Sequence, residues 1–423
     1  MPKNVSDTCS YKIAIIGAGP AGLMAAQVLS DAGYTPTVFD SKLSAGRKFL
    51  QAGRGGLNLT HSEDSTLFQS RYFEAKTFLQ PALKTFNPSD MRYWAENLGF
   101  ETYIGSSGKV YPLDKKSAPL LRAWLQRLKA NKTQFKMKHE LVAYSKNMWQ
   151  FQTPDGLKEY SFDGVILALG GASWPHLGST GSWVKILAEK GLIITPLKPA
   201  NMGFNVNYSK IFKEKFSGTP LKNVELSFTD IDGKLHSKLG ELLISEYGVQ
   251  GSLIYNYSKL LREKIELQTP LTVNLDLFPH RTLSKLQEQL SGKRGKQSLS
   301  AFWKRLGLSG VKASLLREVL AKNSLNEPLV VAQTLKKFPF QLESFRPIEE
   351  AISTAGGLAF ENLDKDLMLK KFPGVFCVGE MLDWEAPTGG YLLTGVMAQG
   401  KQAAEALVKM LQTKHMLKGN HNE

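Results

Sequence analysis

One stretch near the N-terminus constrains the fold more than any other: Lys12 to Asp40, KIAIIGAGPAGLMAAQVLSDAGYTPTVFD. It begins with an apolar, β-branched run from Ile13 to Ile16, which predicts a buried strand. A glycine-rich turn, GAGPAG, follows, and then a helical stretch to about Ala32 and a short strand from Thr35 to Phe39. Strand, glycine turn, helix and strand within about thirty residues predict the first unit of a doubly wound α/β domain.

The residues of this turn have separate physical roles. Gly17 allows a tight turn off the strand, Gly19 lets a pyrophosphate approach the backbone, and Gly22 lets the helix lie close to the sheet. Pro20 stands at the first helical position, where its missing N–H is tolerated. The free amides of the helix end then face the phosphates, and Asp40, eighteen residues after Gly22, can accept hydrogen bonds from ribose hydroxyls. We therefore expect a dinucleotide site here.

Length and composition predict a globular protein of two or three domains. The chain has 423 residues, 42% of them hydrophobic and 10% aromatic. No apolar run of about eighteen residues is free of glycine, proline and charge, so no transmembrane segment is expected. The N-terminus lacks the apolar core of a signal peptide, and we expect a cytoplasmic protein.

The two cysteines, Cys9 and Cys377, are far apart in the sequence. Without a CxxC pair, a redox-active disulfide and a cysteine-ligated metal site are both disfavoured, and no metal is expected. Cys377 lies in the apolar run Val375–Val378 and is expected to be a small buried residue.

The remaining sequence predicts one domain that is interrupted by an insertion. Residues 1–194 continue the dinucleotide-binding domain. Alternating apolar and polar residues predict a β-rich insert over 195–280, and helical periodicity predicts a helical insert over 281–347. Residues 348–423 return to the first pattern and complete the domain.

Two later strands also end in glycine. Asp163–Leu169 predicts a buried strand that runs into Gly170-Gly171, which suits a second close approach of backbone to the cofactor. Gly374–Glu380 predicts another, followed by Asp383 and by Gly389-Gly390-Tyr391 at the start of a helix. No second complete GxGxxG follows, so a second Rossmann domain for a nicotinamide is not indicated.

The net charge of +15 is unevenly distributed. Residues 281–322 hold ten lysines and arginines and two acids, which leaves +8 in one segment. This segment is either a patch for nucleic acid or an anionic surface, or a solvated helical face. No aromatic-basic RNA motif stands out there.

Together, the separated motifs resemble those of the two-dinucleotide-binding-motif flavoprotein superfamily. More narrowly, they are similar to the bacterial BaiN-like (YhiN-like) family of NAD(P)/FAD-dependent oxidoreductases. The match runs over nearly the whole chain. It is carried by Gly17–Gly22, Gly46–Lys48, Gly53–Thr60 (GRGGLNLT), Ala168–Pro175 (ALGGASWP), Gly240–Leu243, Ala355–Gly357, Gly379–Asp383 (GEMLD) and Gly389–Tyr391.

The resemblance implies a Rossmann-like FAD-binding domain, interrupted by an insertion with a β-barrel-like part and a helical part. Asp40 stands where flavoproteins usually have Glu, Leu57 where the family often has Cys, and Leu392 where it often has Asn, which we interpret as marks of a subfamily. The residues expected to contact FAD are Gly17, Gly19, Pro20, Ala21, Gly22, Asp40, Ser41, Lys42, Gly46, Arg47, Lys48, Asn58, Leu59, Thr60, Val142, Ala168, Gly170, Gly171, Gly379, Glu380, Asp383, Gly390, Tyr391 and Leu392.

Within this set, Arg47 and Lys48 are expected to neutralise phosphate charge or to lie over the ring system, with a solvated basic loop as the alternative. The last helix, opened by Gly389 and Gly390, is expected to direct its positive end at the flavin N1/O2 edge and to favour the anionic reduced ring. No general acid or base is identified. The candidates for proton delivery are His61, Tyr111, His176 and Tyr391, each weighed against simple packing or solvent exposure.

The leading hypothesis is an FAD-dependent oxidoreductase that passes electrons directly between flavin and a small organic substrate, with NAD(P)H as the transient reductant. Direct transfer is expected because no cysteine pair is available as a relay. The alternative is an RNA-associated flavoprotein, for tRNA modification or binding, that uses the basic helical insert. A third hypothesis places the basic face on an anionic membrane to reach a quinone.

Overall fold

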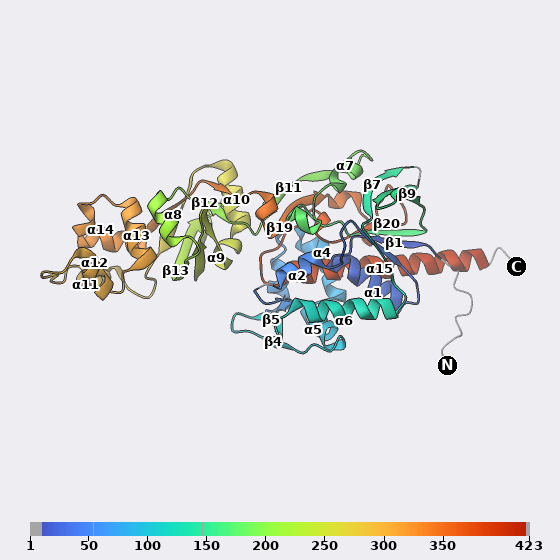
Figure 1. Cartoon of the computed structure of the whole chain (residues 1–423), viewed down its shortest axis with the longest axis horizontal. Helices are drawn as coiled ribbons and strands as arrows, with labels where there is room; N and C mark the ends of the chain where they lie inside the picture. The colour runs from blue at the N-terminus through green and yellow to red at the C-terminus, as the bar shows by residue number, and fades with distance from the viewer. Residues whose placement is uncertain (1–10, 54, 146, 420–423) are drawn as a thin grey trace. The chain divides into compact units, whose positions relative to one another are not determined.

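The computed structural model describes residues 11–53, 55–145 and 147–419. Cys9 and the motif residue Arg54 lie outside these residues. The chain divides into two compact units, whose helices and strands are labelled in Figure 1. Each unit has its own apolar core. Unit 1 runs to Lys198 and resumes at Ser353, and unit 2 is Pro199–Ile352. The borders placed from the sequence, 194/195 and 347/348, lie a few residues before these.

Unit 1 is built on a five-stranded sheet whose neighbouring strands all run parallel. Strands β1 (Ile13–Ile16) and β10 (Gly164–Leu167) are buried at every residue, which accounts for their uninterrupted apolar sequences. Strand β2 (Thr37–Asp40) begins two residues after the start predicted at Thr35, because Pro36 has no N–H to donate within a central strand. The α/β class with a Rossmann-like parallel sheet is confirmed. The order is β20 (Val375–Cys377), β10, β1, β2 (Thr37–Asp40) and β6 (Gln134–Met137).

Helices α1 (Pro20–Asp31) and α15 (Tyr391–Gly419) pack against each other beside this sheet (Figure 1). A Cβ added to Gly400 of α15 would lie 2.2 Å from the carbonyl oxygen of Ala21, so this contact requires glycine. The α15 helix runs to Gly419, the last residue that the structure describes. Neither α15 nor any other described helix is long and apolar enough to cross a membrane.

Smaller elements surround this core. Two three-stranded sheets, β3-β5-β4 and β7-β8-β9, and the pair β11-β19 complete unit 1. A hairpin turn at Pro154-Asp155 joins β8 to β9. The elements are α2 (Arg47–Ala52), β3 (Thr60–His61), α3 (Ser65–Ser70), η1 (Phe73–Ala75), α4 (Lys76–Thr85), α5 (Pro88–Asn97), β4 (Thr102–Ile104), β5 (Lys109–Pro112), α6 (Ser117–Ala130), β7 (Glu140–Ser145), β8 (Met148–Thr153), β9 (Gly156–Tyr160), η2 (Pro175–Leu177), α7 (Trp183–Ala188), β11 (Ile194–Ala200), β19 (Ser353–Leu358) and η6 (Gly379–Met381).

Unit 2 is built on a seven-stranded sheet in the order β17-β16-β13-β14-β15-β12-β18. Its β13–β14 hairpin turns around Asp232-Gly233. The edge strands β17 and β18 are separated by Glu343 alone, so the two edges of the sheet come together. The bounds are β12 (Phe204–Asn205), α8 (Lys210–Phe216), β13 (Pro220–Thr229), β14 (Leu235–Ile244), β15 (Gly248–Gln250), α9 (Ser252–Tyr255), α10 (Ser258–Leu267), β16 (Leu271–Asp276), β17 (Phe338–Leu342) and β18 (Ser344–Phe345).

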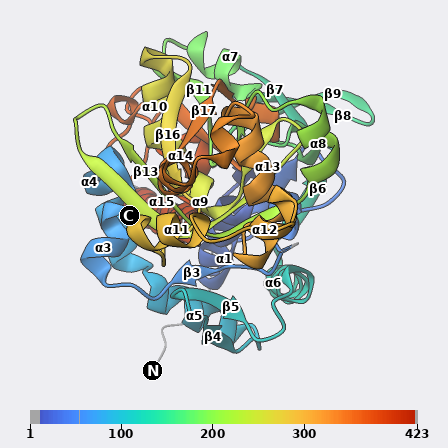
Figure 2. The same ribbon diagram turned by 90° about the vertical axis from the view of Figure 1, so that its left-hand side faces the viewer.

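The segment expected to be helical, 281–347, contains four α-helices that are drawn in orange in Figure 2. The expectation of helix is wrong for 338–345. There Phe338, Phe340 and Leu342 are buried and alternate with exposed residues, a period of two that pairs β17 with β16. The helices are α11 (Leu283–Leu290), α12 (Leu299–Arg305), α13 (Gly310–Val319) and α14 (Pro328–Lys336).

Candidate functional site

The glycine-rich turn after β1 is shaped by close approaches of the backbone. A Cβ on Gly17 (φ +111°) would lie 2.1 Å from the carbonyl oxygen of Ala168, and one on Gly22 would lie 2.0 Å from the carbonyl oxygen of Gly17. A Cβ on Gly19 would meet no atom of the described residues within 4 Å. Gly19 is the N-cap of α1, and no side chain caps this helix. The turn therefore offers helix-end amides with open space beside them, as an anionic ligand requires.

Asp40, at the end of β2, is held by the same turn. Its Oδ2 accepts a hydrogen bond from the Ala18 amide and its Oδ1 accepts one from the Lys42 amide, both at 2.8 Å. Burial raises the pKa of Asp40 above its ordinary value, although these amides and the charges of Lys42 and Arg47 act in the opposite direction. A carboxylate has about four acceptor sites, so Asp40 keeps capacity for the ribose hydroxyls that the sequence assigns to it.

Arg47 brings an unsatisfied donor to this turn. The Gly46 amide donates to the Ala18 carbonyl at 2.8 Å, which ties the start of α2 to the turn. The Nε of Arg47 is buried and has no hydrogen-bond partner among the described residues, and its Nη1 contacts Ser44 Oγ only at 3.5 Å. A buried cationic donor without a partner is costly, and a bound anion would satisfy it.

Lys48 connects loops that lie far apart in the sequence. Its ammonium group donates to Ser173 Oγ at 2.9 Å and to Glu380 Oε2 at 2.6 Å, with Ser179 Oγ at 3.4 Å. The second oxygen of Glu380 accepts the Thr354 amide at 3.0 Å, and the Glu380 side chain is 8% exposed. Because Ser173 follows β10 and Glu380 follows β20, both strand ends meet at α2. Lys48 thus belongs to a mostly buried polar network and not to a solvated loop.

Two of the expected cofactor glycines are approached by groups of the protein itself. A Cβ on Gly171 would lie 2.2 Å from Thr354 Oγ1, and the Gly379 amide donates to Gln399 Oε1 at 2.9 Å. Gly379 (φ +84°) also lies against the N-terminus of α1, where an added Cβ would be 3.0 Å from the Cβ of Ala21. Both glycines therefore have a packing role at the strand ends.

The N-terminus of α15 is fastened to β3. A Cβ on Gly390 (φ +89°) would lie 2.4 Å from the Cα of Thr60, and the Thr394 hydroxyl donates to the Thr60 hydroxyl at 2.9 Å. The buried Tyr72 hydroxyl donates to the carbonyl oxygen of Tyr391 at 2.8 Å. These contacts fix the helix end whose positive dipole the sequence assigns to a flavin.

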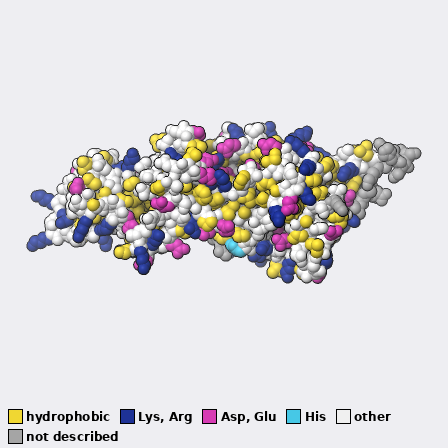
Figure 3. Space-filling view, turned by 90° about the horizontal axis from the view of Figure 1, so that it is seen from above, with side chains coloured by type: hydrophobic (Ala, Val, Ile, Leu, Met, Phe, Trp, Pro, Cys, Tyr) yellow, Lys and Arg dark blue, Asp and Glu magenta, His cyan; other side chains and the backbone are white. Residues whose placement is uncertain are grey.

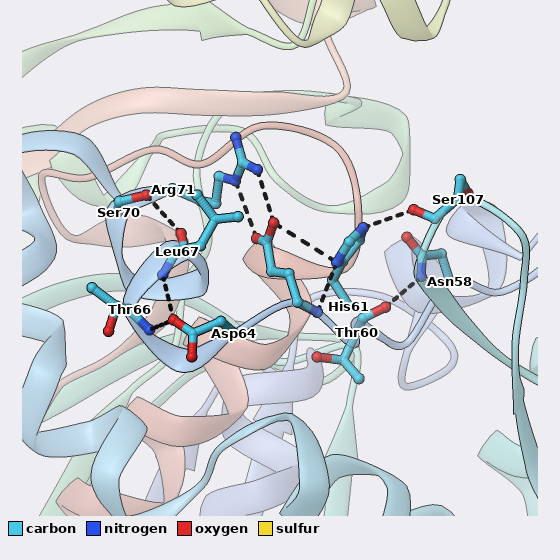
Figure 4. A network of polar contacts seen from close by, with 10 residues as sticks. Asn58, Thr60, His61, Asp64, Thr66, Leu67, Ser70, Arg71 and Ser107 are labelled. Atoms are coloured by element: carbon cyan, nitrogen blue, oxygen red, sulfur yellow. Dashed lines mark hydrogen bonds and ion pairs between the residues drawn. The ribbon is translucent and has the colours of Figure 1, made fainter.

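A charged network beside this helix end holds the Tyr391 side chain, and Figure 4 shows its part around Arg71 and His61. Glu63, which is 8% exposed, accepts hydrogen bonds from Arg71 Nε at 3.1 Å and from Arg71 Nη2 at 2.8 Å. The Tyr391 ring centroid lies 5.9 Å from the guanidinium carbon of Arg71, 5.6 Å from the ring centroid of His61 and 5.0 Å from that of Phe68. Burial raises the pKa of Glu63, but Arg71 and Tyr391 outweigh burial and leave this pKa below its ordinary value.

The four candidates for proton delivery have different surroundings. The Nδ1 of His61 accepts the Glu63 amide at 3.2 Å, and its Nε2 lies 3.0 Å from a carbonyl oxygen of the β4–β5 turn, so both ring nitrogens are engaged. Burial raises the pKa of Tyr111 and that of Tyr391, which weakens both hydroxyls as acids. His176 is exposed on η2. The structure brings His61 and Tyr391 together, but as members of a packed network.

Residues at the start of β3 support the strand. The side-chain amide of Asn58 donates to the carbonyl oxygens of Thr60 and Val110 at 2.8 and 3.1 Å. Leu57 and Leu59 are fully buried. The side chains of Asn58 and Leu59 therefore serve the scaffold that faces the Gly390 turn.

The other expected contacts lie in different surroundings. Asp383 Oδ2 accepts the Thr195 hydroxyl at 2.5 Å, and the Gly170 carbonyl accepts the indole N–H of Trp183 at 2.8 Å. Val142 is exposed and lies where the pairing of β7 with β8 shifts, so its backbone falls outside the regular ladder. Ser41 follows β2, and Leu392 is the second residue of α15.

Sequence reasoning missed four polar residues of the site, Glu63, Arg71, Ser173 and Thr354. Ser173 stands within the quoted motif ALGGASWP, which was a usable signal. Glu63 and Arg71 stand eight residues apart in no motif, and Thr354 reaches the site from β19. Only the tertiary fold brings these side chains to the strand ends.

Comparisons with known proteins confirm the resemblance to a bacterial flavoprotein family. The chain is 25% identical over 411 residues to the 3-dehydro-bile acid Δ(4,6)-reductase of Clostridium scindens, covering 93% of this chain and 98% of that protein. It is 24% identical over 400 residues to the ribosomal RNA dihydrouridine synthase of Haemophilus influenzae, covering 89% and 93%. The 3-ketosteroid Δ1-dehydrogenase structure from Sterolibacterium denitrificans aligns over 95% of this chain and all of that chain, with 12% identity and a TM-score of 0.49. The HI0933-like protein Rossmann domain family matches residues 11–406, and this chain therefore belongs to it.

Proposed function

We propose that unit 1 binds one FAD at the carboxyl ends of β1, β10 and β20, and that the protein is an FAD-dependent oxidoreductase. This proposal rests on two observations at one turn: the open space at Gly19, and the buried Nε of Arg47, which has no hydrogen-bond partner among the described residues. Both fit a pyrophosphate, and Asp40 has acceptor capacity left for a ribose. When bound, FAD would supply the transfer of a hydride equivalent.

The groups of the chain itself would bind and orient the reactants. Arg47 and the end of α1 would hold phosphate charge, and the positive end of α15 would favour negative charge that develops beside Gly390. Cys377 is fully buried, and burial raises the pKa of its thiol, so it is no electron relay. Electrons would therefore pass directly between cofactor and substrate.

The proposed reaction is the saturation of a carbon–carbon double bond in an organic substrate. The names of the two relatives, a Δ(4,6)-reductase and a dihydrouridine synthase, both describe such a step. NAD(P)H would give the hydride that ends on one carbon, and a proton would be added to the other.

Anaerobic titration of the purified protein with NADH and with NADPH tests this function. We expect the absorbance band of bound flavin to bleach with at least one of them and to return when an unsaturated carbonyl compound is added. A band that resists both reductants would contradict NAD(P)H linkage. Protein that is colourless and stays so after addition of FAD would contradict the cofactor.

The second candidate function is reduction of a nucleobase within RNA. It is favoured by the exposed cations of the helical part of unit 2, where Lys293, Arg294 and Lys296 follow one another between α11 and α12. Figure 3 shows lysine and arginine side chains in dark blue projecting at the end of unit 2 that carries these helices. The ribosomal RNA dihydrouridine synthase of Escherichia coli is a further relative, 21% identical over 409 residues.

Binding of a labelled ribosomal RNA fragment as a function of salt tests the second candidate. We expect binding that weakens steeply as salt rises, because each neutralised phosphate releases counterions. Weak binding at low salt would dismiss RNA as the substrate and leave a small unsaturated molecule.

A further inference from the structure

We propose that Glu63 and Arg71 are positioning residues that set, through Tyr391, the place and the local charge of the N-terminus of α15, and so tune the reduction potential of the bound cofactor. This inference rests on the proposed FAD site. It concerns side chains that belong to none of the glycine motifs and that no relative's name describes.

The first step is geometric. Tyr391 is the first residue of α15 and directly follows Gly390, whose backbone lies against Thr60. Its backbone carbonyl oxygen accepts the Tyr72 hydroxyl, and its ring centroid lies 5.9 Å from the guanidinium carbon of Arg71. Because Tyr72 holds the backbone of Tyr391 while the Glu63–Arg71 pair packs beside its ring, Tyr391 links this ion pair to the start of the helix.

The second step concerns how the network is held in place. Glu63 is 8% exposed and stands beside Tyr391, which is 5% exposed. Arg71 meets this carboxylate with two parallel N–H···O bonds, the geometry that gives the strongest charge-assisted pairs. The guanidinium carbon of Arg71 also lies 5.9 Å from the Tyr391 ring centroid, so the cation contacts both members of the network.

The third step is the charge balance at the helix end. The pair is neutral as a whole, and the positive end of α15 adds its own field beside it. Loss of Arg71 would leave an uncompensated negative charge, which disfavours addition of electrons nearby. Loss of the Glu63 charge would leave a positive one, which favours it. The two changes therefore act on reduction in opposite directions.

The experiment measures the reduction potential of FAD bound to wild type, Arg71→Gln, Glu63→Gln and the double variant. We expect the potential to fall in R71Q, to rise in E63Q and to return towards wild type in the double variant. Each single change should alter the ratio of affinities for reduced and oxidised cofactor by roughly tenfold, the order expected for one unit charge at a protein-like effective dielectric. Arg71→Lys, which keeps the charge, should stay near wild type.

The matched control is Arg127→Gln, which removes an arginine from a more exposed pair with Asp31 at 2.9 Å elsewhere in unit 1. Its potential should equal that of wild type. Shifts of the same sign in R71Q and E63Q, or no shift in either, would overturn the inference, because a purely structural role has no reason to follow charge. If R71Q does not fold, the reduction potentials of R71K and E63Q are sufficient to test the inference. Failure of wild type to bind FAD would instead refute the proposed function.

Discussion

The strand ends of unit 1 and the helical part of unit 2 handle charge in opposite ways. In unit 1, Glu380 and Glu63 are each 8% exposed and lie 2.6 and 2.8 Å from a basic side chain. In unit 2, Lys293, Arg294 and Lys296 are exposed, and none forms an ion pair with another described residue. Because a buried charge needs a partner and a solvated one does not, substitutions should act on folding in unit 1 and on association in unit 2.

The largest effect is expected where backbone meets backbone. Gly17→Ala puts a Cβ 2.1 Å from the carbonyl oxygen of Ala168 at a φ of +111°, and should destabilise unit 1 by about 3 kcal/mol or more. The matched variant is Gly19→Ala, whose Cβ would meet nothing within 4 Å. We expect G19A to fold like wild type but to bind FAD roughly tenfold more weakly or worse, because the methyl group occupies the space for phosphate. Denaturant unfolding measures the loss of stability, and FAD titration measures the loss of binding. Equal stabilities for the two variants would contradict the effect predicted for Gly17.

The next effect is expected at the Lys48–Glu380 pair. Lys48→Met leaves the Glu380 carboxylate without its cation, and should cost about 2 kcal/mol, less than the value for a fully buried pair because Lys48 is 26% exposed. The double variant with Glu380→Gln should recover part of the loss. Unfolding in denaturant measures both, and a double-mutant cycle with no coupling would show that the ion pair contributes nothing.

Low pH should lower the folding stability of unit 1 through protonation of Glu63. The pKa of this carboxyl is lowered in the folded protein, so its pairing contributes stability that is fully present above the unfolded value of about 4.3 and is lost as the pH falls through the lower folded value. Melting temperatures of wild type and Glu63→Gln, compared from about pH 6 to about pH 3, measure this. The stability advantage of wild type over E63Q should shrink on acidification, and a constant difference would contradict the assignment.

The smallest effect on folding is expected in unit 2. Replacing Lys293, Arg294 and Lys296 with Gln should change stability by no more than about 0.5 kcal/mol. If RNA is the partner, the same triple variant should lower the slope of binding against salt by about one unit for each phosphate that is no longer neutralised. Replacement of three exposed lysines of unit 1, Lys84, Lys129 and Lys185, with Gln is the control, and an equal loss of RNA binding in both triple variants would remove the distinction between the regions.

Much of the fold of unit 1 was predictable because its signals are local. The strand–turn–helix of residues 13–31 and the buried strand before Gly170 are encoded by apolar runs and glycine spacing. The strand at 338–342 was mistaken for helix, because its alternation of Phe338, Phe340 and Leu342 is short and follows a long helical pattern. Within the site, the glycines could be found from spacing, whereas the Glu63–Arg71 pair and Thr354 could not, because their interactions depend on tertiary packing.

The central claim is that the strand ends of unit 1 hold one FAD. Equilibrium titration of the purified protein with FAD, after removal of any flavin that copurifies, tests it most directly through quenching of flavin fluorescence. We predict saturation at one FAD per chain, with binding weakened in the folded G19A variant. Absence of saturable binding by folded wild-type protein would contradict the account.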